Sequence, residues 1–139
     1  MERLVFAHQK FSKSLHALER SLNFSLKYSA SAATDELENS VASLIKHFEI
    51  CYEMCWKFLQ QYIKQYHFVE LASPKAIFRE CFVLKIINQE ETKKLLDISE
   101  ARNATTHDYN EETARESCSR ISAYFITLKA LDRITFVEK

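Results

Sequence analysis

The segment from Arg102 to Tyr109 concentrates side chains that can do chemistry. It reads Arg-Asn-Ala-Thr-Thr-His-Asp-Tyr and so brings together a guanidinium, a carboxamide, two hydroxyls, an imidazole, a carboxylate and a phenol. Histidine titrates near neutral pH and can move a proton, whereas arginine holds phosphate with a rigid fork of donors. Arg102 and His107 are therefore the candidate pair. The plainer interpretation is a solvated connector between two helices, because connectors are usually polar.

The spacing of Arg102 and His107 constrains how they could cooperate. Five residues apart on an ideal helix, their side chains would point roughly 140° away from each other. A connector between them, or a symmetric partner, is needed to bring them together. Asn110 is expected to start the next helix, and a helix N-terminus attracts anions. The group suits a phosphodiester or a nucleotide phosphate better than a carbonyl substrate.

A second candidate is a metal site on the long helix expected around residue 50. His47, Cys51 and Cys55 follow one another at four-residue spacing, which places a soft-metal ligand set on one helix face. Three ligands spread over about 12 Å of one helix cannot converge on one ion. Cysteine is also a common core residue, so we expect core packing, no metal and no cofactor.

The remaining histidines and aromatic residues carry weaker signals. No patterned partners accompany the other histidines considered, which are His8, His16 and His67. A dense aromatic group could stack nucleic-acid bases, but core and interface packing is the simpler interpretation. This group consists of Tyr52, Trp56, Tyr62, Tyr66 and Phe68.

Composition narrows the possible functions. Among 139 residues, 19 basic side chains balance 19 acidic ones, which excludes a globally basic nucleic-acid coat. The chain has no glycine, where average usage would give about ten. A glycine-rich phosphate loop or dinucleotide fingerprint is therefore impossible, and any chemistry that needs one must come from another chain. Neither a signal peptide nor a run long enough to span a membrane is evident, so a cytoplasmic location with reduced thiols is expected.

The apolar periodicity predicts long helices joined by short connectors. The expected helices run from about Leu4 to Tyr28, from about Asp35 to Tyr66, from Ser73-Pro74 through an apolar run to Ile87, from Asn88 to Arg102 or Asn103, and from Asn110 to about Ile134. Leu26 is expected on the buried apolar face of the first of these helices. The third segment is apolar nearly all round, so it should be central. Residues 1–139 should form one all-α domain: an antiparallel up-and-down bundle of four main helices plus one short helix.

Local signals support several of these helix starts. Thr34 and the acids after it suit the positive end of a helix dipole. Ser73 should cap the third helix, with Pro74 in its first turn. Asn88 followed by Glu91 resembles a capping box for the short helix.

The pattern Arg102-x₄-His107-x-Tyr109, with Asn103 after the arginine, in a short all-helical chain resembles the HEPN family (higher eukaryotes and prokaryotes nucleotide-binding). The similarity is greatest to the branch paired with a minimal nucleotidyltransferase. It implies a homodimeric helical bundle with the motifs near the two-fold axis. Arg102 and His107 would carry metal-independent ribonuclease activity, assisted by Asn103 or Asp108.

The same resemblance implies two roles for a partner chain. In paired systems the nucleotidyltransferase is an antitoxin that can transfer AMP onto the tyrosine matching Tyr109. In the other interpretation, the helical chain is the substrate-binding subunit of a two-component nucleotidyltransferase. The absence of glycine excludes the transferase itself, whose catalysis uses a Gly-Ser start.

Three hypotheses follow. The first is an interaction protein: a homodimer that binds a separate minimal nucleotidyltransferase chain and presents the polar segment to it, to nucleotide or to RNA. The second is a ribonuclease whose composite site uses Arg102 and His107 across the dimer. The third is a helical bundle without an active site.

Overall fold

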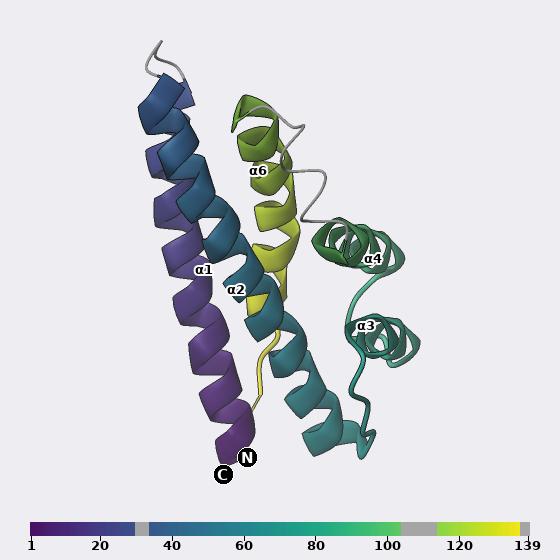
Figure 1. Ribbon diagram of the computed structural model, residues 1–139. Helices are drawn as coiled ribbons and strands as arrows, with labels where there is room; N and C mark the ends of the chain where they lie inside the picture. Colours follow the sequence, from purple (N-terminus) through teal and green to yellow (C-terminus); the bar gives the residue numbers. More distant parts are fainter. Residues whose placement is uncertain (30–33, 104–113, 137–139) are drawn as a thin grey trace.

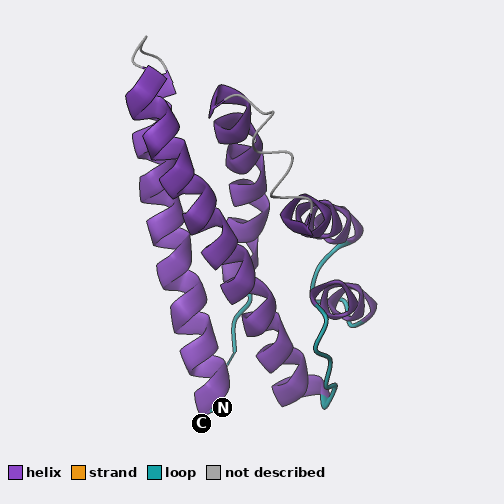
Figure 2. Ribbon diagram, viewed as in Figure 1, coloured by secondary structure: helices purple, strands orange, loops and turns teal. Residues whose placement is uncertain are grey.

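The computed structural model describes residues 1–29, 34–103 and 114–136, and these residues are helical with short connectors (Figure 1). No strand occurs in these ranges (Figure 2). The helices are α1 (Glu2–Ser29), α2 (Thr34–His67), α3 (Pro74–Val83), α4 (Gln89–Asn103) and α6 (Ala114–Ala130), followed by the 3₁₀ turn η1 (Leu131–Arg133). The all-α class is therefore confirmed. None of the helices in the described ranges is long and apolar enough to cross a membrane.

The arrangement of the helices differs from a four-helix up-and-down bundle. In Figure 1, α1 runs upward beside α2, which runs downward, and α6 descends next to them. In the same view α3 and α4 are seen nearly end-on, so they lie across the other three helices. The fold is thus a long α1–α2 hairpin with α6 alongside it and two shorter helices crossing.

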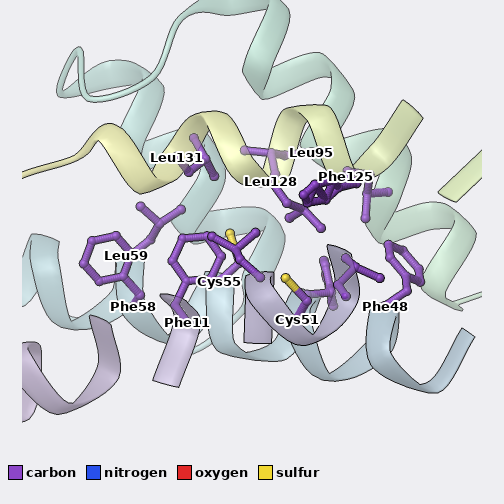
Figure 3. Packing of buried hydrophobic residues seen from close by; sticks show 14 of the residues in the cluster. Phe11, Phe48, Cys51, Cys55, Phe58, Leu59, Leu95, Phe125, Leu128 and Leu131 are labelled. Carbon is purple, nitrogen blue, oxygen red and sulfur yellow. The ribbon is translucent and has the colours of Figure 1, made fainter. Parts of the chain in front are cut away.

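A continuous apolar core joins the five helices of the described ranges. Phe11 from α1, Phe48 and Phe58 from α2, and Leu128 from α6 have no exposed surface, and Figure 3 shows them packed together. The rings of Phe11 and Phe58 stack with centroids 5.6 Å apart. Leu26, expected on the buried stripe of α1, is instead 44% exposed, whereas the adjacent Ser25 is fully buried, so the buried face of α1 passes through Ser25 at this end of the helix.

Helix α3 is not central, contrary to the sequence prediction. Ile77 and Phe78 are buried, but Phe82 and Val83 are 44% and 68% exposed. The helix also ends at Val83 instead of continuing to Ile87. Its all-round apolar character therefore leaves a hydrophobic strip facing outward.

The start of α4 confirms the predicted capping box. The Glu91 backbone N–H donates to the Asn88 Oδ1 atom at 2.8 Å, and the Asn88 backbone N–H donates to Glu91 Oε1 at 3.0 Å. The start of α3 does not follow its prediction, because Ser73 makes no side-chain capping bond. There the Ser73 carbonyl accepts the backbone N–H of Ile77 at 2.9 Å, and Pro74 occupies the first turn.

Two helices end with non-glycine residues in left-handed backbone conformations. Phe68 follows α2 with φ 57°, and Lys85 follows α3 with φ 64°. Beyond them, Val69 N–H donates to the carbonyl of Ile63 and Ile86 N–H donates to that of Cys81. This closing pattern normally uses glycine. A chain without glycine therefore places side chains where a left-handed conformation costs about 1–2 kcal/mol.

Glycine at either position is expected to stabilise the fold. Phe68→Gly and Lys85→Gly should each raise the free energy of unfolding by about 0.5–1 kcal/mol, since the relief of strain exceeds the added entropy of the unfolded chain. Phe68 is 89% exposed, so little packing is lost. Urea denaturation measures the change. Lys93→Gly, inside α4, is the control and should destabilise by about 1 kcal/mol; destabilisation by all three variants would refute the strain argument.

Candidate functional site

Arg102 lies in the last turn of α4, which ends at Asn103 as the sequence predicted. Its Nη2 atom is 3.9 Å from Oε2 of Glu49 on α2, and the two side chains are 36% and 34% exposed. The Nε atom is buried and has no hydrogen-bond partner within the described ranges. The guanidinium is thus held against α2 on one side while part of it faces solvent.

A buried hydrogen-bond chain fixes α4 next to Arg102. The Tyr52 hydroxyl on α2 donates to Ser99 Oγ at 2.9 Å, and the Ser99 hydroxyl donates to the Leu95 carbonyl at 2.9 Å. Burial raises the pKa of Tyr52, against the lowering effect of the Ser99 hydrogen bond. The positive charge of Arg102 also lowers this pKa. Tyr52 therefore stays a neutral donor that sets the position of α4.

The rest of the predicted motif cannot be placed by this geometry. His107, Asp108 and Tyr109 lie outside the described residues. Asn103 is in the last turn of α4, and its side chain is likewise not described. What the described site offers is one partly exposed guanidinium at a helix end, near Glu49, which can bind a phosphate or carboxylate.

Glu49 and Ser99 are site residues that sequence reasoning missed. Each is a polar position on a helix whose pattern is ordinary for an amphipathic helix. Only the crossing of α4 over α2 brings them to Arg102 and Tyr52. A polar serine on the buried face of a short helix was the one available signal, since buried hydroxyls need partners.

The cysteines belong to the core. Cys51 and Cys55 have no exposed surface, and Figure 3 places them among the apolar side chains. Burial raises the pKa of Cys51 and of Cys81 to about 12 and also raises the pKa of Cys55. The described ranges contain no group of three metal-binding side chains. His47 instead bonds the Ser43 carbonyl through Nδ1 at 2.9 Å.

The thiols are accordingly expected to be unreactive in the folded protein. At pH 8 a thiol with a pKa near 12 is ionised in roughly one molecule in 10⁴. Ellman's reagent should therefore modify the thiols slowly under native conditions and promptly in denaturant. Fast native reaction of more than one thiol would contradict their burial.

His8 and most of the aromatic group considered from the sequence pack within the fold. His8 Nε2 lies 3.4 Å from Asp132 Oδ1, and its ring packs on Phe58 at 5.1 Å. Within the aromatic group, Tyr52 is buried, and Trp56 and Tyr62 pack on the core as partly buried rings. The exposed members are Tyr66, at 38%, and Phe68, at 89%.

A groove between α1 and α2 was not predicted. Its volume is about 530 Å³, within the usual range for ligand pockets. Phe24 and Arg20 line it from α1, and Glu36, Asn39 and His47 line it from α2. These residues lie on two helices, and only the folded hairpin defines how the two helices are aligned. The spacing of residues in the sequence could therefore not reveal the groove.

Comparison with known proteins places this geometry in a family. The model of a family described as nucleotidyltransferase substrate binding protein like matches residues 7–134. The chain belongs to this family. The match reaches each helix of the described ranges, including the α4 end that carries Arg102. No protein of curated function matches the sequence.

A solved structure shares the fold of this family member. It is the crystal structure of a protein from Thermus thermophilus, 26% identical in sequence, with a TM-score of 0.72. The alignment covers 89% of this chain and 99% of the Thermus chain. The crossed arrangement of helices is therefore found in a second protein, over nearly the whole of its length.

Proposed function

We propose that the chain is a homodimeric subunit that pairs with a separate minimal nucleotidyltransferase chain, as its substrate-binding subunit or as the toxin partner of a toxin–antitoxin pair. The observation that carries this proposal is the family match over residues 7–134. The resemblance to the HEPN family supports the same pairing through Arg102, His107 and Tyr109.

Two physical features support a division of labour between chains. Without glycine the chain cannot form the phosphate-cradling loop of a transferase, so nucleotide activation must be supplied in trans. Arg102, held at one edge by Glu49, offers a fixed positive charge to a phosphate. The proposed role is therefore to bind and present, and the partner performs the transfer.

Co-expression with the neighbouring reading frame tests the pairing. If that frame encodes a short protein with a Gly-Ser start and spaced aspartates, the two chains should co-purify through a tag on either one. Light scattering of the complex should then show two copies of the helical chain. An unrelated neighbour, or a nucleotidyltransferase that never co-purifies, would count against the proposal.

The second candidate function is a metal-independent ribonuclease acting through Arg102 and His107 across the dimer, with support from Asn103 and Asp108. The observation that favours it is the state of Arg102. Its guanidinium lies 3.9 Å from the Glu49 carboxylate, and about a third of the side chain is exposed. An arginine in that state can steady a phosphodiester transition state.

Cleavage of RNA in the presence of EDTA tests the second candidate. Arg102→Ala and His107→Ala should each abolish cleavage while the far-ultraviolet circular dichroism is unchanged. Arg79→Ala, which removes an exposed arginine from α3, is the matched control and should cut like the wild type. Equal cleavage by all variants would reject the composite site. Intact mass after co-expression would show whether Tyr109 gains AMP.

A further inference from the structure

The groove between α1 and α2 has a floor built from small residues. Ala17 and Ser21 lie one turn apart on α1, and Ser40 and Ser43 line the groove from α2. Small side chains let the two helices form a hollow, because no large side chain fills the space above their contact. The groove is therefore part of the packing of the hairpin.

The walls of the groove offer three different kinds of recognition. The Phe24 ring is 52% exposed, so an aromatic ligand can pack against it. The Glu36 carboxylate and the Asn39 carboxamide can bond sugar hydroxyls or ring nitrogens. Arg20 is exposed and has no ion-pair partner in the described ranges, which leaves its guanidinium available to an anion.

The lining groups come from both helices of the hairpin. Arg20 and Phe24 are four residues apart on α1, so their Cα atoms are separated by about 6 Å, one turn of the helix. His47 lines the same groove. Its Nδ1–H donates to the Ser43 carbonyl at 2.9 Å, so Nε2 is the ring atom that can bond a ligand. A ligand that suits this set of groups has an aromatic ring, hydroxyls and an anionic group.

We propose that the α1–α2 groove binds a mononucleotide-like ligand, with the base on Phe24, the sugar hydroxyls at Glu36 and Asn39, and the phosphate at Arg20. The site is separate from the one around Arg102. That the ligand is presented to a partner enzyme rests on the proposed function, whereas the binding itself belongs to this chain alone.

Isothermal titration of the full chain with three probes tests the site. AMP contains the base, the sugar and the phosphate, adenosine lacks the phosphate, and inorganic phosphate lacks the ring. AMP should saturate one site per chain. Adenosine and inorganic phosphate should each bind at least about tenfold more weakly, because adenosine loses the charge-assisted contact and inorganic phosphate loses the stacking contact.

Two variants separate the roles of the walls. Phe24→Ala should weaken both AMP and adenosine by about fivefold or more, since stacking is lost for either probe. Arg20→Gln should weaken AMP to the level of adenosine and leave adenosine unchanged. The matched controls are Phe82→Ala, which removes a ring exposed to 44% on α3, and Arg79→Gln; both should bind AMP like the wild type.

Each alternative outcome overturns the assignment. Absence of saturable AMP binding would show that the groove is not this site. Equal losses in the groove variants and in their controls would place binding elsewhere. Because no partner chain is present in the titration, these results are independent of co-purification with a nucleotidyltransferase, which tests the proposed function.

Discussion

Phe58→Ala is expected to lower the free energy of unfolding by about 3–5 kcal/mol, as for large rings removed from protein cores. Phe58 has no exposed surface. Its ring stacks on Phe11 of α1 at 5.6 Å and contacts His8 at 5.1 Å. It also lies 6.3 Å from Phe136, beyond η1. Truncation would therefore open a cavity where three parts of the chain meet. Urea denaturation followed by circular dichroism measures the loss.

Phe82→Ala provides the control for this change. It deletes the same atoms from a ring that is 44% exposed on α3. The loss there should stay below about 1 kcal/mol, because water already covers much of the ring. Similar losses in the two variants would mean that Phe58 does not occupy the centre of the core.

The individual helices could be predicted because their signals are local. Apolar residues at three- and four-residue spacing located α1 and α2, and each begins and ends within two residues of its predicted bounds. The pairing of Asn88 with Glu91 correctly marked the start of α4. The predicted start of the last helix at Asn110 lies outside the described residues. Its predicted end was about Ile134, but the α-helix stops at Ala130 and the 3₁₀ turn η1 follows.

The arrangement of the helices could not be predicted in the same way. An apolar stripe shows that a helix buries a face, but it does not show which neighbour covers that face or at what angle. Phe82 and Leu26 illustrate the limit, since both fit apolar patterns and both are 44% exposed. Whether such a residue is buried depends on which face of its helix the neighbouring helices cover, since the adjacent Ser25 and Cys81 are fully buried.

The candidate site also has parts that the sequence could predict and parts that depend on tertiary structure. The sequence placed Arg102 at a helix end, which the structure confirms. It could not supply Glu49 or the Tyr52–Ser99 hydrogen bond, because these depend on α4 crossing α2. The groove at Phe24 likewise depends on the register between α1 and α2. Residue types indicate chemistry, whereas their partners require tertiary structure.

Glu91→Gln is expected to lower the free energy of unfolding by about 1–2 kcal/mol at pH 7, because it removes a charge-assisted pair. Glu91 accepts hydrogen bonds from Arg133 at 2.5 and 2.7 Å. The carboxylate is 13% exposed and the guanidinium 48%, so solvent screening keeps the effect below that of a fully buried pair. Glutamine keeps the bond from Asn88, so the variant isolates the contact that ties the start of α4 to η1.

The pH dependence of this difference follows from the pKa of Glu91. Burial opposes ionisation of the carboxyl, but the hydrogen bonds from Arg133 and the Asn88 backbone, together with the charge of Arg133, lower its pKa. A lowered pKa gives stability that is complete above the unfolded value of about 4.3 and disappears as pH falls through the folded value. The wild type and Glu91→Gln should therefore differ at pH 7 and converge in acid. Glu90→Gln, at the neighbouring exposed position, should stay within about 0.5 kcal/mol of the wild type throughout. A difference that persists in acid would assign the effect to packing. Convergence would establish that ionised Glu91 anchors one end of α4, the helix that carries Arg102 at its other end.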